Sequence, residues 1–531
     1  MTGLALDRRD DLAVSQAATH QRGAVQGSLQ RRRFCRTAGL LALLLTAAVA
    51  MPGPSRAVAL WTDPVVLFST DQGFVSAPVM LADPENTVHL FFISSESNAP
   101  TKVRPTNLAG AAGAGLPGRI MYARLVAGRW SRPIDILATP GGAPITMTDV
   151  ALDTEGYLHV IWKNGATGAL EYSRAHVAEA AIGPSVWTSP QALFADPLTS
   201  VEYGAPAAIT AGQNGSVHLV YATLDGNVAY RRSDDTGESW SPPVTVAGPD
   251  APDTRPGMTR IAVSGDGSLD VTWTDHVYPS GWPPVGSFSS RSTDGGLTWG
   301  NPIRITGPNY ALVNMVTTAP NIIQRVWNGV AAVGERRHQW SADGGATWSR
   351  ATLVAPTSTI SGGLTGYPAL AIDSAGALHL ATAVDNKGDI APGGSIYYLY
   401  WDGQRWSAPE YISRGALGKH QVASPAIAIS EGNRLHVTYE DDNERIWYTT
   451  RLLDAPTVSA SVIPPPPVAV APPMQPSPRP SLVSYPPQPT APISMTDLQP
   501  TNEPAAPLLI AAICTLFLVS TIVLARATRP A

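Results

Sequence analysis

A loop at residues 275–286, between two predicted strands, carries the side chains best suited to bind a ligand. It places Tyr278 and Trp282 among prolines, which would hold both aromatic rings exposed. Exposed aromatic faces stack on sugar rings, although such a pair can equally pin a loop to its own domain. Upstream, Arg255 and Arg260 could meet the carboxylate of an acidic sugar or pair with neighbouring carboxylates. These four residues head the predicted ligand-binding set.

Further ligand-binding candidates stand where innermost strands of the predicted fold begin, because such strands bring distant parts of a chain to one concave centre. They are Glu202, Tyr203, Tyr310, Tyr367 and His420. Catalytic residues are not assigned, and neither a cofactor nor a metal ion is predicted. Acidic runs at 385–389 and 440–444 have the composition of calcium loops, but we interpret them as solvated turns.

Three windows share the pattern Ser-x-Asp-x-Gly-x-x-Trp, and their spacing is that of structural repeats. In such a turn Asp accepts backbone N–H groups, Gly supplies a positive φ, and Trp packs between sheets. Their carboxylates are therefore interpreted as structural rather than as acid/base groups. The residues are Ser233, Asp235, Gly237, Trp240, Ser292, Asp294, Gly296, Trp299, Ser341, Asp343, Gly345 and Trp348.

Histidines also repeat at one place in each unit, whereas a catalytic or metal-binding histidine would serve a single site. We interpret these as structural: His89, His159, His218, His379 and His436.

The elements that position these residues are short strands. Each repeat contains four of them in roughly 50–60 residues, which is the size of one propeller blade. First strands recur near Pro78, Asp149, Pro206, Arg260, Leu312, Pro368 and Pro425. The last unit lacks its closing strand, and the segment that begins at Trp61 supplies one. The sequence therefore predicts an all-β propeller of four-stranded blades, seven in number with six as the alternative, closed by an N-terminal strand.

The overall composition supports this fold and argues against nucleic acid as a partner. Charged residues make up 15%, while Gly (47) and Pro (49) are abundant, as in a protein of many strands and turns. With a net charge of −5 and no basic run in the predicted body, nucleic acid is not expected as a partner. The two cysteines, Cys35 and Cys514, leave no disulfide in the body.

The two ends of the chain are predicted to direct export and anchoring. Residues 1–57 form a signal peptide whose arginine cluster resembles a twin-arginine signal, with general secretion as the alternative. Residues 58–454 form the propeller, and 455–507 a disordered Pro-rich stalk. The apolar run at 508–525 is a transmembrane helix, and 526–531 a cytoplasmic tail. The expected location is the cell membrane, with a single span and the propeller on the extracytoplasmic side.

The three windows resemble the Asp boxes, or BNR repeats, of the sialidase superfamily, and the resemblance covers about residues 60–452. It implies a propeller, and six blades if the chain follows the sialidases themselves. Sialidases hold the substrate carboxylate with an Arg triad and use a Tyr nucleophile with a Glu partner and an Asp acid/base. Here the first inner strand around Pro78 has no Arg, and the loop at 94–118 has no Asp. The catalytic set is therefore not carried over.

Two functions follow from this pattern. We favour a monomeric, surface-anchored propeller that binds glycan or protein through the face carrying its long loops, at 94–118, 275–286 and 384–395. The alternative is an exo-α-sialidase-like glycoside hydrolase with a divergent active site.

Overall fold

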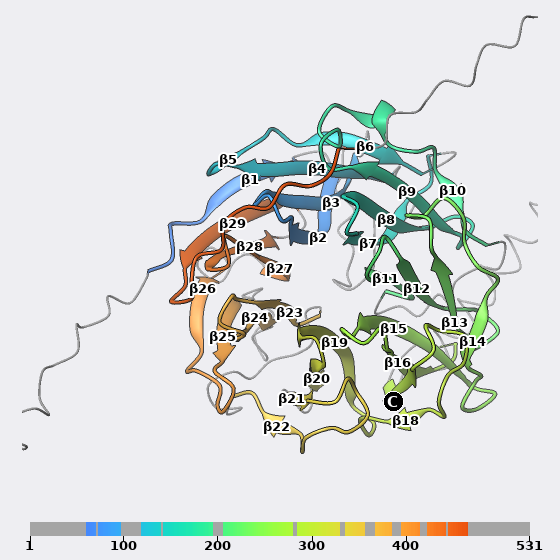
Figure 1. Cartoon of the computed structure of the whole chain (residues 1–531). Helices are drawn as coiled ribbons and strands as arrows, with labels where there is room; N and C mark the ends of the chain where they lie inside the picture. Colours follow the sequence, from blue (N-terminus) through green and yellow to red (C-terminus); the bar gives the residue numbers. More distant parts are fainter. Residues whose placement is uncertain are drawn as a thin grey trace, which may run out of the picture. The chain divides into compact units, whose positions relative to one another are not determined.

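The chain folds into a ring of seven antiparallel sheets that surround a central axis (Figure 1). This computed structural model describes residues 60–70, 73–96, 118–139, 142–194, 205–279, 284–329, 335–355, 367–384, 395–414, 422–441 and 444–465. Six sheets have four strands, and one carries an additional strand of two residues. The predicted all-β propeller is confirmed, with seven blades rather than six. We number the blades 1 to 7 along the chain, beginning with the sheet of β2.

The strands occupy equivalent places in each blade. The innermost strands are β2 (Gly73–Ala82), β7 (Ile145–Leu152), β11 (Ala207–Ala211), β15 (Thr254–Val263), β19 (Tyr310–Ala319), β23 (Ala369–Ile372) and β27 (Val422–Ser430). The second strands are β3 (Val88–Glu96), β8 (Tyr157–Asn164), β12 (Val217–Ala222), β16 (Leu269–Val277), β20 (Ile322–Gly329), β24 (Leu378–Val384) and β28 (Arg434–Asp441). The third strands are β4 (Gly118–Val126), β9 (Leu170–His176), β13 (Val228–Ser233), β17 (Pro284–Ser292), β21 (Arg336–Ser341), β25 (Ser395–Trp401) and β29 (Arg445–Leu452). The outer strands are β6 (Ile134–Ala138) with the short β5 (Arg129–Trp130), then β10 (Gln191–Ala192), β14 (Val244–Ala247), β18 (Ile303–Arg304), β22 (Thr352–Leu353), β26 (Glu410–Arg414) and β1 (Val65–Ser69). A short 3-10 helix, η2, spans Pro184–Val186.

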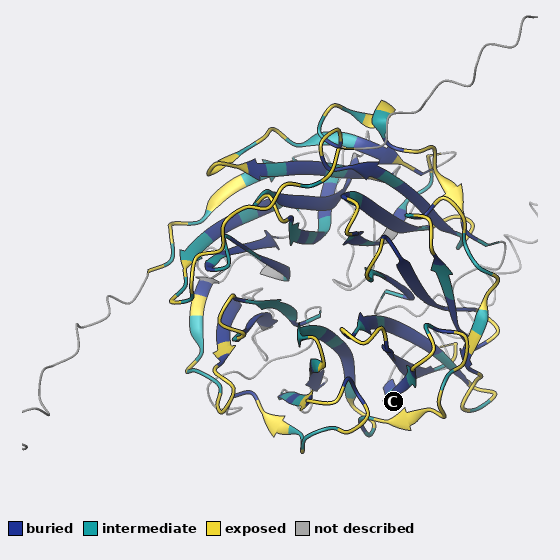
Figure 2. Cartoon of the chain, viewed as in Figure 1, coloured by how far each residue is buried: buried dark blue, intermediate teal, exposed yellow. Residues whose placement is uncertain are grey.

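Second strands are the most deeply buried, because each lies inside its sheet and is covered by the sheets of both neighbouring blades (Figure 2). Every residue of β12, for example, is buried. Apolar clusters fill the space between successive sheets, as in other stacked-sheet proteins. The outer strands are short, and three of them (β10, β18 and β22) are two exposed residues long, so only small edges remain to protect.

The N-terminal strand closes the ring, as the sequence predicts. β1 pairs antiparallel with β29 and becomes the outer strand of blade 7. Just before it, the Thr62 backbone N–H donates to the Thr450 carbonyl at 3.0 Å. The Trp61 ring packs edge-on against Tyr398 of blade 6, with 5.2 Å between centroids. The two ends of the folded body therefore meet in one sheet.

A tryptophan from each blade packs toward the preceding blade. Trp299 lies edge-on to Tyr230 at 5.2 Å between centroids, and the same kind of contact joins Trp240 to Tyr172 at 5.4 Å. The tryptophans at this position are Trp61, Trp130, Trp187, Trp240, Trp299, Trp348 and Trp406. Trp348 differs, because its ring is covered by the Arg325 guanidinium of its own blade at 3.6 Å. Repetition of this aromatic contact explains why one tryptophan recurs in each unit.

The Asp-box turns use their polar groups internally. The Asp294 carboxylate accepts the Thr298 backbone N–H at 2.9 Å and the Ser292 hydroxyl at 2.8 Å. Hydrogen bonds from Thr298 in particular lower the pKa of Asp294 to about 2. Gly296 has φ +90°, and a Cβ there would lie 2.0 Å from the Tyr230 ring, so only glycine fits. The boxes of Asp235 and Asp343 repeat these bonds.

The repeated histidines link strands inside their own blades. Each Nδ1 is 2.7–2.8 Å from a tyrosine hydroxyl of the third strand. In three blades Nε2 donates to a buried aspartate, as from His159 to Asp153 at 3.0 Å, so Nδ1 accepts the tyrosine proton. Burial lowers the pKa of His159 and His218, which favours the neutral ring. These contacts give the histidines a packing role in every blade that has one.

Residues 455–465, which the sequence assigns to the stalk, lie against the propeller. They follow β29 and contain neither helix nor strand. The remainder of the predicted stalk lies outside the described residues, as do the predicted signal peptide, transmembrane helix and tail. Within the described ranges no helix has both the length and the apolar character needed to cross a bilayer.

Candidate functional site

One face of the ring carries the connections between second and third strands, and we call it the long-loop face. The Asp-box turns, between third and outer strands, lie at the opposite end of the strands, on the Asp-box face. The three long loops predicted from sequence join β3 to β4, β16 to β17 and β24 to β25, all on the long-loop face. Most of their residues lie outside the described ranges.

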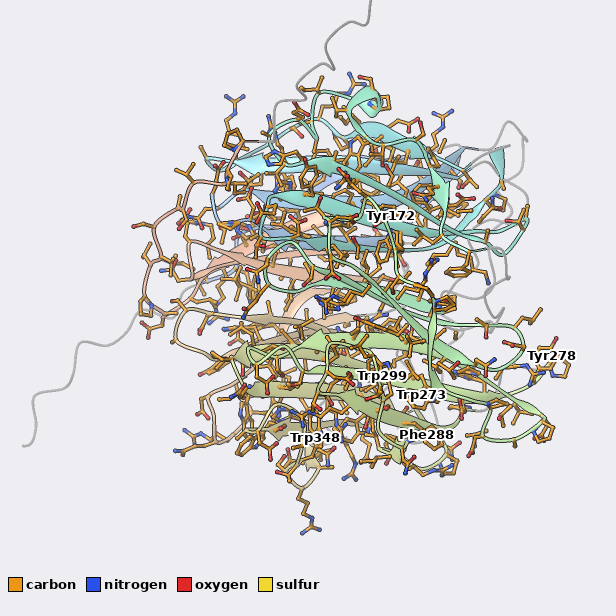
Figure 3. The ribbon with its side chains drawn as sticks, turned by 45° about the vertical axis from the view of Figure 1, so that its right-hand side comes forward. Tyr172, Trp273, Tyr278, Phe288, Trp299 and Trp348 are labelled. Carbon is orange, nitrogen blue, oxygen red and sulfur yellow. The ribbon has the colours of Figure 1, made fainter. Side chains whose placement is uncertain are left out.

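Arg255 and Tyr278 form a fixed pair at the rim of the long-loop face. The guanidinium carbon lies 4.7 Å from the centroid of the Tyr278 ring. Arg255 donates from Nε to the Leu224 carbonyl at 2.8 Å and from Nη1 to the carbonyls of Thr254 and Pro252 at 2.7 and 3.1 Å. Tyr278 remains 40% exposed and stands clear of the strands (Figure 3). The arginine is thus held by main-chain groups of blade 3, blade 4 and the segment between them, and it supports an exposed aromatic ring.

A second polar group lies where blade 5 begins. The Tyr310 hydroxyl donates to the Glu335 carboxylate, and Arg337 Nε donates to the same carboxylate oxygen at 2.7 Å. Burial alone would raise the pKa of Glu335, but the hydrogen bonds from Arg337 and Tyr310 lower it. Burial and the Glu335 contact together raise the pKa of Tyr310. Tyr310 is therefore a neutral donor, and Glu335 an ionised acceptor.

These two groups flank the same long loop. Tyr278 stands at the start of that loop, and Pro284 follows its end as the first residue of β17. The Pro284 carbonyl accepts the backbone N–H of Asn309 at 3.4 Å, beside Tyr310. The Arg255–Tyr278 pair thus lies at one described end of this loop, and the Tyr310–Glu335–Arg337 group lies beside the other.

Arg260 and Tyr367 meet inside the ring instead. The Arg260 guanidinium lies 3.6 Å from the centroid of the Tyr367 ring, although the two residues come from blades 4 and 6. Tyr367 also packs on buried Met258 and Leu312, from blades 4 and 5. This pair joins non-adjacent blades, whereas Arg255 and Tyr278 are at the surface.

A half-buried carboxyl group accompanies the central pair. Asp149, on β7, accepts the backbone N–H of Val150 at 3.0 Å and that of Ile209, in the next blade, at 3.1 Å. Burial raises the pKa of Asp149, and the charge of Arg260 opposes that shift. This carboxyl therefore links inner strands.

The described ligand-binding candidates thus separate into three pairs. The structure brings Arg255 together with Tyr278, and Arg260 together with Tyr367, while Tyr310 pairs with Glu335. Trp282, Glu202, Tyr203 and His420 lie outside the described residues. Sequence reasoning missed Glu335 and Arg337, because it considered only long loops and first-strand starts. The charged run Glu335-Arg336-Arg337, at the start of β21, is the signal that would have found them.

Glu440, on β28, is a buried carboxyl beside the seam at which the ring closes. It is 1% exposed and accepts the Ser424 hydroxyl at 2.9 Å. Burial raises its pKa from 4.5 to about 7. The interpretation of residues 440–444 as a solvated turn is wrong at its start, because Glu440 and Asp441 complete a strand covered by other blades.

We expect Glu440→Gln to stabilise the protein at neutral and higher pH, because glutamine keeps an acceptor for Ser424 and removes a buried charge. The folded-state pKa lies above the unfolded value, so the carboxyl favours folding below pH 4.5 and loses this effect as the pH rises through about 7. Urea titrations should show similar stabilities near pH 4 and a gain for the variant on the order of 3 kcal/mol near pH 8. A variant no more stable than the parent at pH 8 would contradict this.

The fold and its turns define a class, that of seven-bladed Asp-box β-propellers. No family model and no curated protein matches the chain. Similar solved structures include a sialidase from Streptococcus pneumoniae, with 12% identity, a TM-score of 0.41, and coverage of 73% of this chain and 70% of that one. A polysaccharide lyase, an ulvan lyase, has 11% identity and a TM-score of 0.48, covering 76% and 98%. A mutant Aleuria aurantia lectin in complex with alpha-methyl-L-fucoside has 12% identity and a TM-score of 0.38, covering 65% and 96%. These likenesses concern the fold.

Proposed function

We propose that this propeller is a binding module that takes a glycan on its long-loop face, across blades 4 and 5. The observation that carries the proposal is the Arg255–Tyr278 pair, an exposed aromatic ring whose inner neighbour is a guanidinium fixed by three carbonyl groups. A ring held in this way loses little conformational freedom on binding, so contact with a sugar face is gained at low entropic cost. Glu335 and Arg337, beyond the loop, add an acceptor and donors for sugar hydroxyls.

Tyr278→Ala should abolish most of the binding. A glycan array probed with the full-length protein identifies the ligand, and titration of that glycan should show a roughly tenfold weaker affinity for the variant, because an aromatic stack contributes about 1 kcal/mol or more. Tyr411→Ala is the matched control, since Tyr411 is a similarly exposed tyrosine (48%) on an outer strand of blade 6. Equal affinities of the Tyr278 and Tyr411 variants would contradict the proposed site.

A second candidate function is hydrolysis of a sialoside, and the Tyr310–Glu335 contact favours it as a nucleophile and its base. The pKa directions act against this role: the phenol of Tyr310 holds its proton more tightly, and Glu335, already bonded to Arg337, is a weaker base. We therefore expect the protein to hydrolyse a fluorogenic sialoside near the background rate. Turnover that Tyr310→Phe abolishes, with folding intact, would establish the hydrolase instead.

We further propose that the propeller is displayed outside the cell on a membrane anchor. The support is in the sequence, where an apolar run at 38–51 follows an arginine cluster and a second run at 508–525 precedes Arg526 and Arg529. Protease added to intact cells should release a soluble fragment of about residues 58–500. A fragment protected from the protease would contradict the orientation.

A further inference from the structure

Residues 455–465 follow a defined path over the Asp-box face, and we call this segment the strap. It begins at blade 7, where the Asn433 side-chain amide donates to the Ala455 carbonyl at 3.1 Å. The backbone N–H of Val458 then donates to the Glu431 carbonyl at 2.8 Å. Further along, the Ser461 N–H donates to the Pro84 carbonyl of blade 1 at 2.7 Å. Figure 1 shows this last described segment running from β29 across the sheet of β2–β4.

The strap contacts the same structural feature in four consecutive blades, namely the turn between the first and second strands. In blade 6 the Ser374 hydroxyl donates to the Pro456 carbonyl. The turns of blades 7 and 1 bind it through their backbone carbonyls, as above. The strap reaches blade 2 at Ile463, which packs on the buried cluster between blades 1 and 2. Its Cγ2 atom is so close to Gly156 that a Cβ added to that glycine would lie 2.4 Å from it.

These contacts cross the seam where the ring closes. Blades 7 and 1 also meet directly there, since the Asn86 side chain accepts the Glu431 N–H at 2.7 Å and lies 3.4 Å from the Val458 carbonyl. The Ile463 N–H is bonded to the Glu85 carboxylate at 3.1 Å, which fixes the far end on blade 1. A segment attached on both sides of a seam must be released, at least at one end, before that seam can open.

We infer that the strap is a second closure of the ring, formed by the C-terminal end of the body as β1 is formed by its N-terminal end. β1 completes blade 7 within a single sheet, whereas the strap joins blade 7 to blades 1 and 2. The turns of the Asp-box face are therefore covered here by a segment of the same chain. The strap also leaves the long-loop face uncovered, because its hydrogen bonds are made to turns at the opposite ends of the strands.

The full-length double variant Val458→Pro/Ser461→Pro tests this inference. Proline removes the two N–H groups that bind Glu431 and Pro84 and alters no residue of the blades. Hydrogen exchange followed by mass spectrometry should show roughly tenfold faster exchange in β29 and β2, beside the seam, and unchanged exchange in β15–β17. The matched control is Ala460→Pro, since the Ala460 N–H makes no hydrogen bond to a described residue; its exchange should match that of the parent.

Ile463→Ala tests the end of the strap that lies on blades 1 and 2, and it does so without introducing proline. We expect faster hydrogen exchange at the seam between these two blades. Equal exchange at β29 and β2 in the parent and the double variant would overturn the inference. Equal acceleration by Ala460→Pro would also overturn it, because strain in the strap rather than its bonds to the two turns would then be responsible.

Discussion

Removal of residues 58–70 should open blade 7 and lower the melting temperature clearly. The deletion takes away β1, which pairs with β29, and the Trp61 ring, which packs on Tyr398 of blade 6. A large aromatic contributes about 3–5 kcal/mol at such a contact, and the strand hydrogen bonds add to it. A loss on the order of 5 kcal/mol lowers the melting temperature of a body this size by roughly 6 °C.

The matched comparison is a protein that lacks only residues 1–57 and keeps the whole of β1. Calorimetry of the two should show a normal transition for this shorter deletion and a lowered one for the longer deletion. Identical transitions would mean that β1 is not needed to close the ring.

Trp299→Ala should destabilise the propeller by about 3–5 kcal/mol, because it removes a large ring from between blades 3 and 4. Trp299 lies edge-on to Tyr230 and packs against the apolar cluster of that seam. Asp294→Ala should cost less, since it removes only the acceptor of a surface turn. Urea unfolding of both variants measures the difference.

Trp340→Ala is the control for Trp299, because Trp340 is a tryptophan of the next blade with 38% of its surface exposed. We expect it to cost under about 1 kcal/mol. Both Trp299→Ala and Asp294→Ala should retain ligand affinity while folded, because the Asp-box turns lie on the face opposite Tyr278. An Asp294 variant of normal stability that no longer binds would show that the box belongs to the site.

The fold could be predicted because its information is local and repeated. The tryptophan of each unit, the Asp-box turn and the alternating first strand each appear in one stretch of sequence, and Trp61 marked the missing strand of the last unit. Blade number needed only a count of first strands. The path of residues 455–465 was missed, since a proline-rich composition indicates extended chain but not the turns on which that chain lies.

The site was less accessible to sequence reasoning, because its contacts join residues far apart in the chain. Arg255 and Arg260 are the same residue type five positions apart in β15. Nevertheless, Arg255 binds carbonyl groups beneath Tyr278 at the rim, whereas Arg260 lies on Tyr367 inside the ring. A bulge between Gly257 and Arg260 changes the register between them. Glu335 became a candidate only once β19 and β21 were placed in one blade.

Binding of the ligand on the long-loop face is tested most directly by hydrogen exchange measured with and without the glycan that the array identifies. We predict slower exchange at residues 253–257 and 276–279, around Arg255 and Tyr278, with no change in the Asp-box turns at 292–299 and 341–348. Protection confined to the Asp-box turns, with no change around Tyr278, would contradict the proposed site.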